Sequence, residues 1–145
     1  MIRTSPRQAL PTRIREIFDG ITQVLARHGP DAMAVEEVFH GKNARTALTL
    51  GHARGAILLA AELSAVRIAQ YSPRDIKKTV VGYGGATKDQ VGFMVQRQLR
   101  LKTPPAPPDA ADGVATALCH CMSWNAPSLK ERDMNTGPRM TPGST

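Results

Sequence analysis

The sequence predicts a small α/β domain, because stretches with the apolar periodicity of helices alternate with short β-prone stretches. Ala32–Val35 is a short apolar run after a turn, and we expect a buried strand there that ends at Glu36. Val66–Tyr71 is also β-prone and predicts a second strand. With 145 residues, the chain is long enough for one hydrophobic core. Strands that alternate with helices in this way are typical of a sheet covered by helices.

The helices are predicted from apolar spacing and from the residues that begin and end them. After Pro11, apolar residues recur every three or four positions until Gly29 and Pro30 end the pattern. Gln90 follows Thr87 at the spacing of a capping box. The helices are expected over residues 10–25, 43–64 and 73–81, from Thr87 onward, and from Asp109 onward.

One domain is expected over residues 1–123, followed by a disordered tail over residues 124–145, where the apolar periodicity stops. The longest apolar run, Ala56–Ala61, is far shorter than the ~20 residues that a membrane span needs. The N-terminal residues lack the apolar segment of a secretory signal. We therefore expect a cytoplasmic protein without a membrane segment.

The two cysteines, Cys119 and Cys121, are expected to be reduced and to lie in or near the core. On a helix, this spacing points the two side chains to different faces, which makes a disulfide between them awkward. A closed zinc site needs four ligands, and the sequence has no second pair of Cys and His residues.

Positive charge is concentrated in residues 67–102, which contain eight basic residues but only two acidic residues, in a chain of net charge +7. Clustered positive charge favours binding to a polyanion through its phosphates. A solvated helix face is the alternative interpretation, and charge alone does not separate the two. The basic residues are Arg67, Arg74, Lys77, Lys78, Lys88, Arg97, Arg100 and Lys102.

Three carboxylates are candidates for catalysis. Glu36 ends an apolar strand, where open α/β sheets present functional groups, although a simple surface role is the alternative. Asp109 and Asp112 lie three residues apart at the start of a helix, where Asp109 would otherwise cap the helix. Together the three would suit Mg²⁺ and the cleavage of a phosphodiester. Phe39 follows Glu36 on a predicted loop, where it would either stack on a base or fill the core.

Several linked motifs now point to a known family. In their order and nearly in their spacing over about residues 2–122, they resemble the RuvC-type Holliday-junction resolvases. The motifs are Ala34-Val35-Glu36-Glu37-Val38-Phe39, Lys42-Asn43-Ala44, Leu50-Gly51-His52-Ala53-Arg54-Gly55, the segment Tyr71 to Gly82, the segment Lys88 to Val91, Asp109-Ala110-Ala111-Asp112, and Cys119-His120.

The resemblance implies an RNase H-like fold, which is a mixed sheet flanked by helices, and an endonuclease that resolves four-way DNA junctions by paired nicks. It implies a homodimer, two Mg²⁺ ions in each active site, and the branch-migration proteins RuvA and RuvB as partners. The implied catalytic and metal-binding residues are Glu36, Asp109 and Asp112, and the implied DNA-binding residues are Phe39, Arg74, Lys77, Lys78 and Lys88.

The sequence departs from the family at its N-terminus. Family members begin with a strand that reads approximately Gly-Ile-Asp-Pro-Gly, whose aspartate is the first metal ligand. Here Met1–Thr4 resembles the third strand of the family, and no Asp-Pro-Gly occurs in the chain. We therefore expect the N-terminal strands to be missing and further residues to precede Met1 in the gene. Two alternatives stay open: a relative that binds junctions without cutting them, and an inactive fragment.

Overall fold

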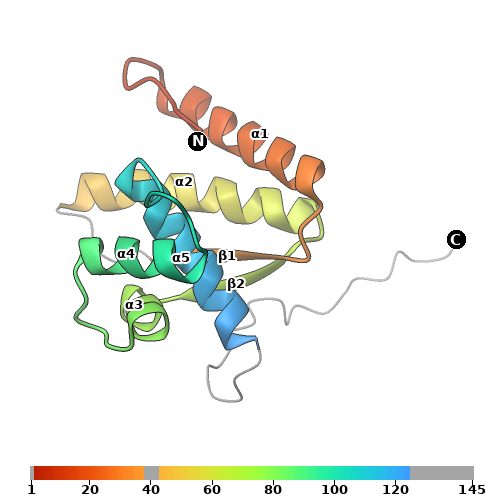
Figure 1. Cartoon of the computed structure of the whole chain (residues 1–145). Helices are drawn as coiled ribbons and strands as arrows, with labels where there is room; N and C mark the ends of the chain where they lie inside the picture. The colour runs from red at the N-terminus through yellow and green to blue at the C-terminus, as the bar shows by residue number, and fades with distance from the viewer. Residues whose placement is uncertain (1, 38–42, 125–145) are drawn as a thin grey trace, which may run out of the picture.

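Two groups of helices enclose a small sheet in the computed structural model, which describes residues 2–37 and 43–124 (Figure 1). The helices and strands agree closely with the predicted segments. In chain order they are α1 (Leu10–His28), β1 (Ala32–Glu36), α2 (Ala44–Leu63), β2 (Arg67–Tyr71), α3 (Pro73–Val81), α4 (Lys88–Gln98) and α5 (Pro108–Ser123).

The described part of the sheet consists of the two parallel strands β1 and β2. Helix α2 is the crossover between them, because parallel neighbours cannot be joined by a tight turn. The register pairs Ala32 with Arg67 and Glu36 with Tyr71, so both strands end at the same edge of the sheet. Strand β1 is half-buried along its length rather than buried as predicted, because β2 is its one neighbour among the described residues.

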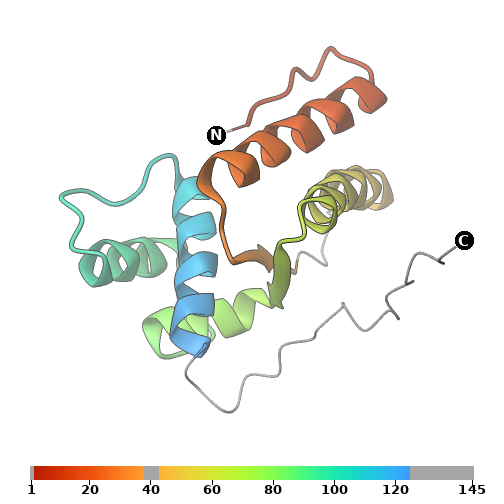
Figure 2. The same cartoon turned by 90° about the vertical axis from the view of Figure 1, so that its right-hand side faces the viewer.

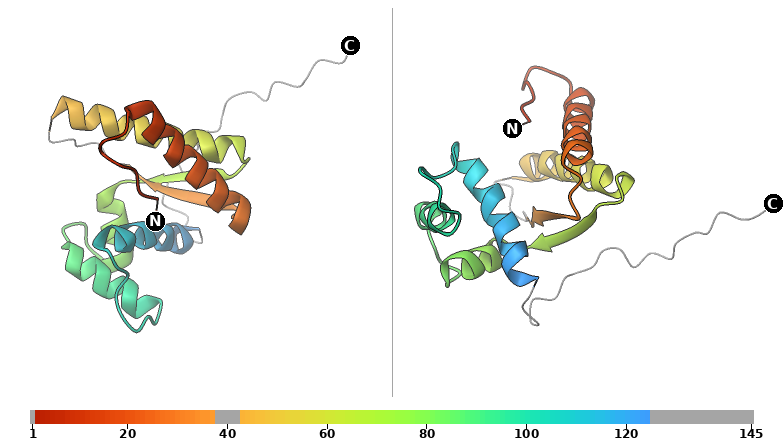
Figure 3. Two further views of the ribbon diagram at one scale, coloured as in Figure 1. Left: turned by 90° about the horizontal axis from the view of Figure 1, so that it is seen from above. Right: turned by 45° about the vertical axis from the view of Figure 1, so that its right-hand side comes forward.

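Helices α1 and α2 lie on one side of the strands, and α3, α4 and α5 lie on the other side (Figures 2 and 3). The main hydrophobic core lies on the α3–α5 side, where these three helices pack against one another and α5 packs against β1. This packing sets the position of α5 relative to the end of the sheet, where Glu36 lies. The buried core residues are Ala69, Tyr71, Ile76, Val80, Ala86, Val91, Val95, Ala115 and Cys119.

Local sequence explains where these helices begin and end. The predicted capping box is confirmed: the Thr87 hydroxyl accepts from the Gln90 N–H, and the Gln90 side chain accepts from the Thr87 N–H. At the start of α3, the Ser72 hydroxyl accepts a hydrogen bond from the N–H of Asp75, without the reciprocal bond of a capping box. Gly29 and Gly82 end α1 and α3 with φ of 52° and 105°, a left-handed conformation that glycine adopts without strain.

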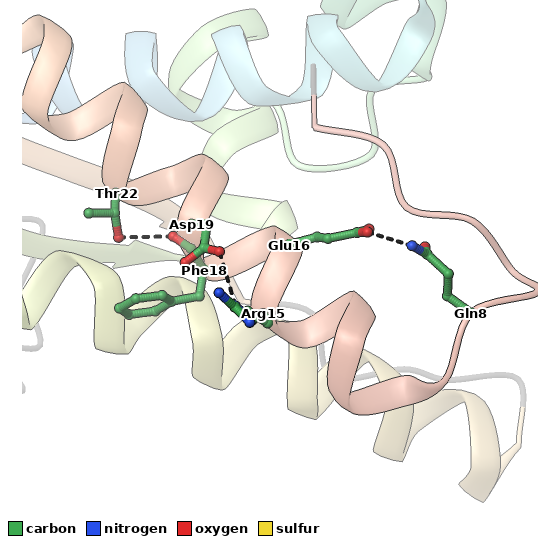
Figure 4. A network of polar contacts seen from close by, with 6 residues as sticks. All are labelled: Gln8, Arg15, Glu16, Phe18, Asp19 and Thr22. Atoms are coloured by element: carbon green, nitrogen blue, oxygen red, sulfur yellow. Dashed lines mark hydrogen bonds and ion pairs between the residues drawn. The ribbon is translucent and has the colours of Figure 1, made fainter.

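The N-terminal segment packs along α1, and the strand expected at Ile2–Thr4 is not formed. The Ile2 side chain lies over Gly20, where a Cβ atom would come within 2.8 Å of it. Gln8 donates a hydrogen bond of 2.6 Å to Glu16, and Arg13 donates one of 3.2 Å to Thr4 (Figure 4 shows the first). The prediction was wrong because contacts with α1, rather than a neighbouring strand edge, hold these residues.

The other predictions about the whole chain have mixed outcomes. Cys119 is buried as expected, and burial raises the pKa of its thiol, but Cys121 is exposed. Residues two positions apart on a helix cannot both face the same core, so this half of the prediction was wrong. Neither cysteine forms a disulfide. Within the described ranges, no helix has the length and apolar character needed to cross a bilayer. The predicted tail, apart from Trp124, lies outside the described residues.

Candidate active site

Four of the predicted site residues line one pocket of about 300 Å³ at the edge where the strands end. Glu36 comes from the end of β1, Lys77 from α3, Lys88 from the first residue of α4, and Asp112 from the second turn of α5. Four different elements therefore bring together residues that are up to 76 positions apart. The rest of the lining is Pro73, Ile76, Val91 and Ala115.

The Lys88 ammonium pairs with the Asp112 carboxylate, with 2.9 Å between Nζ and Oδ2. This hydrogen bond is the main cause that raises the pKa of Lys88, and the charges of Asp112, Asp109 and Glu36 add to it. The Lys88 side chain is 69% exposed, whereas that of Asp112 is only 34% exposed. The lysine therefore stays charged and accessible to an anion from solvent.

The Glu36 carboxyl lies in an environment that disfavours its charge. Burial is the main cause that raises the pKa of Glu36, and the nearby Asp112 carboxylate raises it further. Lys88 and Lys77 oppose this effect but do not reverse it. Glu36 and Asp112 are thus close enough to repel each other, with two ammonium groups beside them.

Asp109 is exposed in the first turn of α5 and does not line the pocket. It does not cap the helix through its side chain either, because the N-cap position is Pro107 and no side-chain cap bond is present. The charge of Asp109 contributes to raising the pKa of Lys88. Within residues 2–37 and 43–124, no three side chains of His, Cys, Asp or Glu converge as a metal-binding group.

The remaining predicted DNA-binding residues lie outside the pocket. Arg74 and Lys78 are both exposed on α3, and the Arg74 stem lies against Gly84, where a Cβ atom would come within 2.6 Å of its Cγ. Phe39 falls outside the described residues. The structure therefore brings Lys77 and Lys88 to the carboxylates and leaves Arg74 and Lys78 on the surrounding surface.

Two contacts near the site were not predicted from the sequence. Arg54 of α2 donates to the main-chain carbonyl of Glu36, and its place in the segment Leu50 to Gly55, which resembles the family, was the available signal. The Tyr71 hydroxyl lies 2.7 Å from His120 Nδ1, which ties the end of β2 to α5. The two rings are also in contact, with centroids 5.8 Å apart.

The donor atoms of this pocket fit one hydrated Mg²⁺ ion. Magnesium prefers oxygen ligands and commonly takes only one or two carboxylates, with water and phosphate oxygens completing its shell. A divalent cation between Glu36 and Asp112 would relieve the repulsion that raises the pKa of Glu36. In the structure, the positive charge beside the Asp112 carboxylate is the ammonium group of Lys88.

Paired carboxylates beside two lysines, at the end of a sheet flanked by helices, are typical of the class of enzymes that cleave phosphodiesters with the help of a metal. The family model described as crossover junction endodeoxyribonuclease RuvC matches residues 1–120. This chain belongs to the RuvC family of crossover junction endodeoxyribonucleases.

Individual relatives agree with the family match. The RuvC of Desulforamulus reducens is 46% identical over 125 residues, which are 86% of this chain and 76% of the relative. The RuvC of Halorhodospira halophila is 50% identical over 123 residues, which are 84% of this chain and 73% of the relative.

Solved structures of RuvC confirm the predicted RNase H-like fold class. The structure of Thermus thermophilus RuvC matches with a TM-score of 0.79, and the same protein in complex with a Holliday junction substrate matches with a TM-score of 0.81. In both cases the identity is 36%, and the match covers 85% of this chain and 74% of the other.

The charge of Glu36 is expected to destabilise the folded protein at neutral pH. Its pKa is raised by folding, so stability is lost as the pH rises from the ordinary value of 4.5 through the raised one. Without divalent ions at pH 7, the midpoint of urea unfolding should therefore lie at a higher urea concentration for Glu36→Gln than for the unchanged protein. This gain should vanish below about pH 4, where the carboxyl is protonated in both states. Equal urea midpoints at pH 7 would contradict the expectation, and Glu37→Gln, outside the pocket, is the matched control.

Proposed function

We propose that this protein is a Mg²⁺-dependent endonuclease that resolves Holliday junctions by paired nicks, acting as a homodimer. The observation that carries the proposal is the single pocket in which Glu36 and Asp112 lie beside Lys77 and Lys88. The solved complex of the Thermus thermophilus relative with a Holliday junction substrate supports this choice of DNA. The motifs of the family around these four residues support it as well.

Each residue has a role in phosphodiester cleavage that follows from its position. Lys77 and Lys88 would bind the oxygens of the scissile phosphate, because they are the two cations of the pocket. Lys88 would contact the phosphate without leaving Asp112, since an ammonium has three donors. Both lysines would then neutralise the charge that develops on the phosphate during cleavage.

Glu36 and Asp112 would hold Mg²⁺, which when bound supplies a Lewis acid and lowers the pKa of the attacking water. The resemblance to the family implies two ions in each site. Asp109, one turn before Asp112 on α5, would contribute to the second. Glu36 is half-buried, so its carboxylate would hold the metal at a position that bulk water reaches less freely.

The function is tested by incubating the protein with a labelled four-way junction in Mg²⁺ and separating the products on a denaturing gel. The proposal requires symmetric nicks that EDTA and Glu36→Gln both abolish, with Glu37→Gln as the control that retains them. Nicking that persists in Glu36→Gln would refute the assigned site.

A second candidate function is junction binding without cleavage. It is favoured by the observation that the described residues contain no convergent group of three metal-binding side chains. Tight and branch-selective binding in EDTA, together with intact DNA after prolonged incubation in Mg²⁺ or Mn²⁺, would select this candidate. A protein that neither binds nor cuts a junction would exclude both functions.

Helix α2 provides the surface that we propose for the homodimer. Helix α2 buries the small residues Ala56, Ala60 and Ala61, whereas Leu59 and Leu63 are 53% and 70% exposed. These leucines lie one helical turn apart, so their side chains are neighbours on the helix surface. Paired nicks require two active sites, and an exposed apolar face of this kind suits a second copy of the chain.

Leu59→Glu is expected to weaken the dimer by at least about tenfold, which corresponds to ~1.4 kcal/mol, because a charge would be buried in an apolar interface. Sedimentation velocity over a concentration series measures the change. Leu99→Glu is the control, since Leu99 is also exposed but lies at the end of α4. Identical sedimentation of Leu59→Glu and the unchanged protein would place the interface elsewhere.

The branch-migration proteins RuvA and RuvB are the proposed functional partners. RuvA and RuvB, which move the branch point, would act on the same junction before it is cut. We propose that these steps take place in the cytoplasm, where the DNA of a bacterial cell is found.

A further inference from the structure

We infer that Arg54 is a positioning residue that fixes the last peptide of strand β1 and thereby sets where the Glu36 carboxylate lies relative to Asp112. The inference rests on the proposed role of Glu36 in metal binding. Arg54 itself is not among the residues that line the pocket.

The guanidinium of Arg54 reaches from α2 to both strands near the edge where they end. Its Nη1 donates a hydrogen bond of 2.7 Å to the main-chain carbonyl of Glu36, and its Nη2 donates to the side-chain oxygen of Gln70. Both acceptors are uncharged, and within the described ranges Arg54 forms no ion pair. A half-buried cation without a carboxylate partner is an unusual arrangement, which points to a role in holding the backbone.

The carbonyl that Arg54 holds lies on the outer edge of β1. The next N–H in the chain, that of Glu37, donates to Tyr71 of β2 at 2.8 Å. In a trans peptide the N–H and the C=O point in opposite directions, so the Glu36 carbonyl points away from β2. The two hydrogen bonds therefore hold the same peptide from both sides: Tyr71 from the sheet and Arg54 from helix α2.

This peptide is attached directly to the Cα atom of Glu36, so its rotation would move the carboxylate. A metal site tolerates displacements of only about 0.5 Å before its ligands lose productive geometry. Groups that orient a metal ligand typically change metal affinity by about 10–100-fold when they are removed. Arg54 would orient the Glu36 carboxylate by holding the backbone. Groups of this kind usually hydrogen-bond to the ligand side chain itself.

The chemistry of the contact requires a guanidinium. Its planar fork offers two donors at a fixed separation, which matches the two acceptors that come from different strands. A lysine would retain the charge but would not bridge both oxygens. Arg54→Lys is therefore expected to behave like Arg54→Met, a result that separates positioning from a general effect of charge.

The experiment measures Mn²⁺ affinity by paramagnetic titration of the full chain without DNA, in four backgrounds: unchanged, Arg54→Met, Glu36→Gln, and the double variant. We expect Arg54→Met to weaken Mn²⁺ binding about tenfold or more and to have no further effect once Glu36 is Gln. Arg45→Met is the matched control, because Arg45 is an exposed arginine on the same helix. Thermal melts and junction binding in EDTA identify any variant that is simply misfolded.

A second readout does not depend on the metal. Hydrogen exchange of the Glu37 amide should become faster in Arg54→Met and in Arg54→Lys, while exchange in α1 stays unchanged. Unaltered exchange and unaltered Mn²⁺ affinity in Arg54→Met would overturn the inference, as would equal losses of affinity with and without Glu36. If Glu36→Gln alone binds Mn²⁺ normally, the proposed function fails instead.

Discussion

The double variant Lys77→Ala, Lys88→Ala is expected to bind a four-way junction much more weakly and with a shallower dependence on salt. Each lysine that neutralises a phosphate contributes about 0.9 to the slope of log affinity against log salt, so the slope should fall by about two. These two lysines are the cations that line the carboxylate pocket. Binding to labelled junctions over a range of salt concentrations in EDTA measures the slope directly.

The matched control for this variant is Arg100→Ala, Lys102→Ala. It removes the same charge from the same basic segment, but both residues are exposed and neither lines the pocket. A general electrostatic attraction would make the two double variants equally weak. Equal losses would therefore contradict a phosphate site at Lys77 and Lys88, whereas a smaller loss in the control would support it.

Leu25→Ala is expected to destabilise the protein by about 2–5 kcal/mol, which is the usual range for a buried leucine in a core. Leu25 is 6% exposed and is the buried residue of α1, so it anchors this helix. Urea unfolding monitored by circular dichroism measures the loss in the free energy of unfolding. Val24→Ala is the control, because its side chain is 48% exposed and its replacement should change stability by less than about 0.5 kcal/mol. Equal midpoints for Leu25→Ala and Val24→Ala would show that α1 does not depend on this anchor.

The parts of the fold that depend on neighbouring residues were predictable from the sequence. The capping box of Thr87 and Gln90 and the end of α1 at Gly29 are examples, because each is decided within one or two helical turns. The segment at Ile2–Thr4 was not predictable in this way. Its conformation depends on contacts with Gly20 and other residues of α1 that local sequence does not reveal.

The residues of the candidate site were also predictable only in part from the sequence. Glu36 at a strand end and Asp112 at a helix start were identified as candidates from their positions, but the resemblance to a family was needed to bring them together. The pairing of Lys88 with Asp112 joins residues 24 positions apart through the packing of α4 on α5. The contact of Arg54 with Glu36 was missed because the acceptor is a backbone carbonyl, and any residue at position 36 would offer the same acceptor.

The most direct test of the proposed metal site is a Mn²⁺ titration of the unchanged protein, Glu36→Gln, Asp112→Asn and the control Glu37→Gln. We expect the unchanged protein and Glu37→Gln to bind Mn²⁺ equally well. Glu36→Gln and Asp112→Asn should each lose at least about tenfold in affinity, because one of the two carboxylates would be gone. Mn²⁺ binding that is unchanged in both Glu36→Gln and Asp112→Asn would contradict the assignment of these residues as the metal-binding pair.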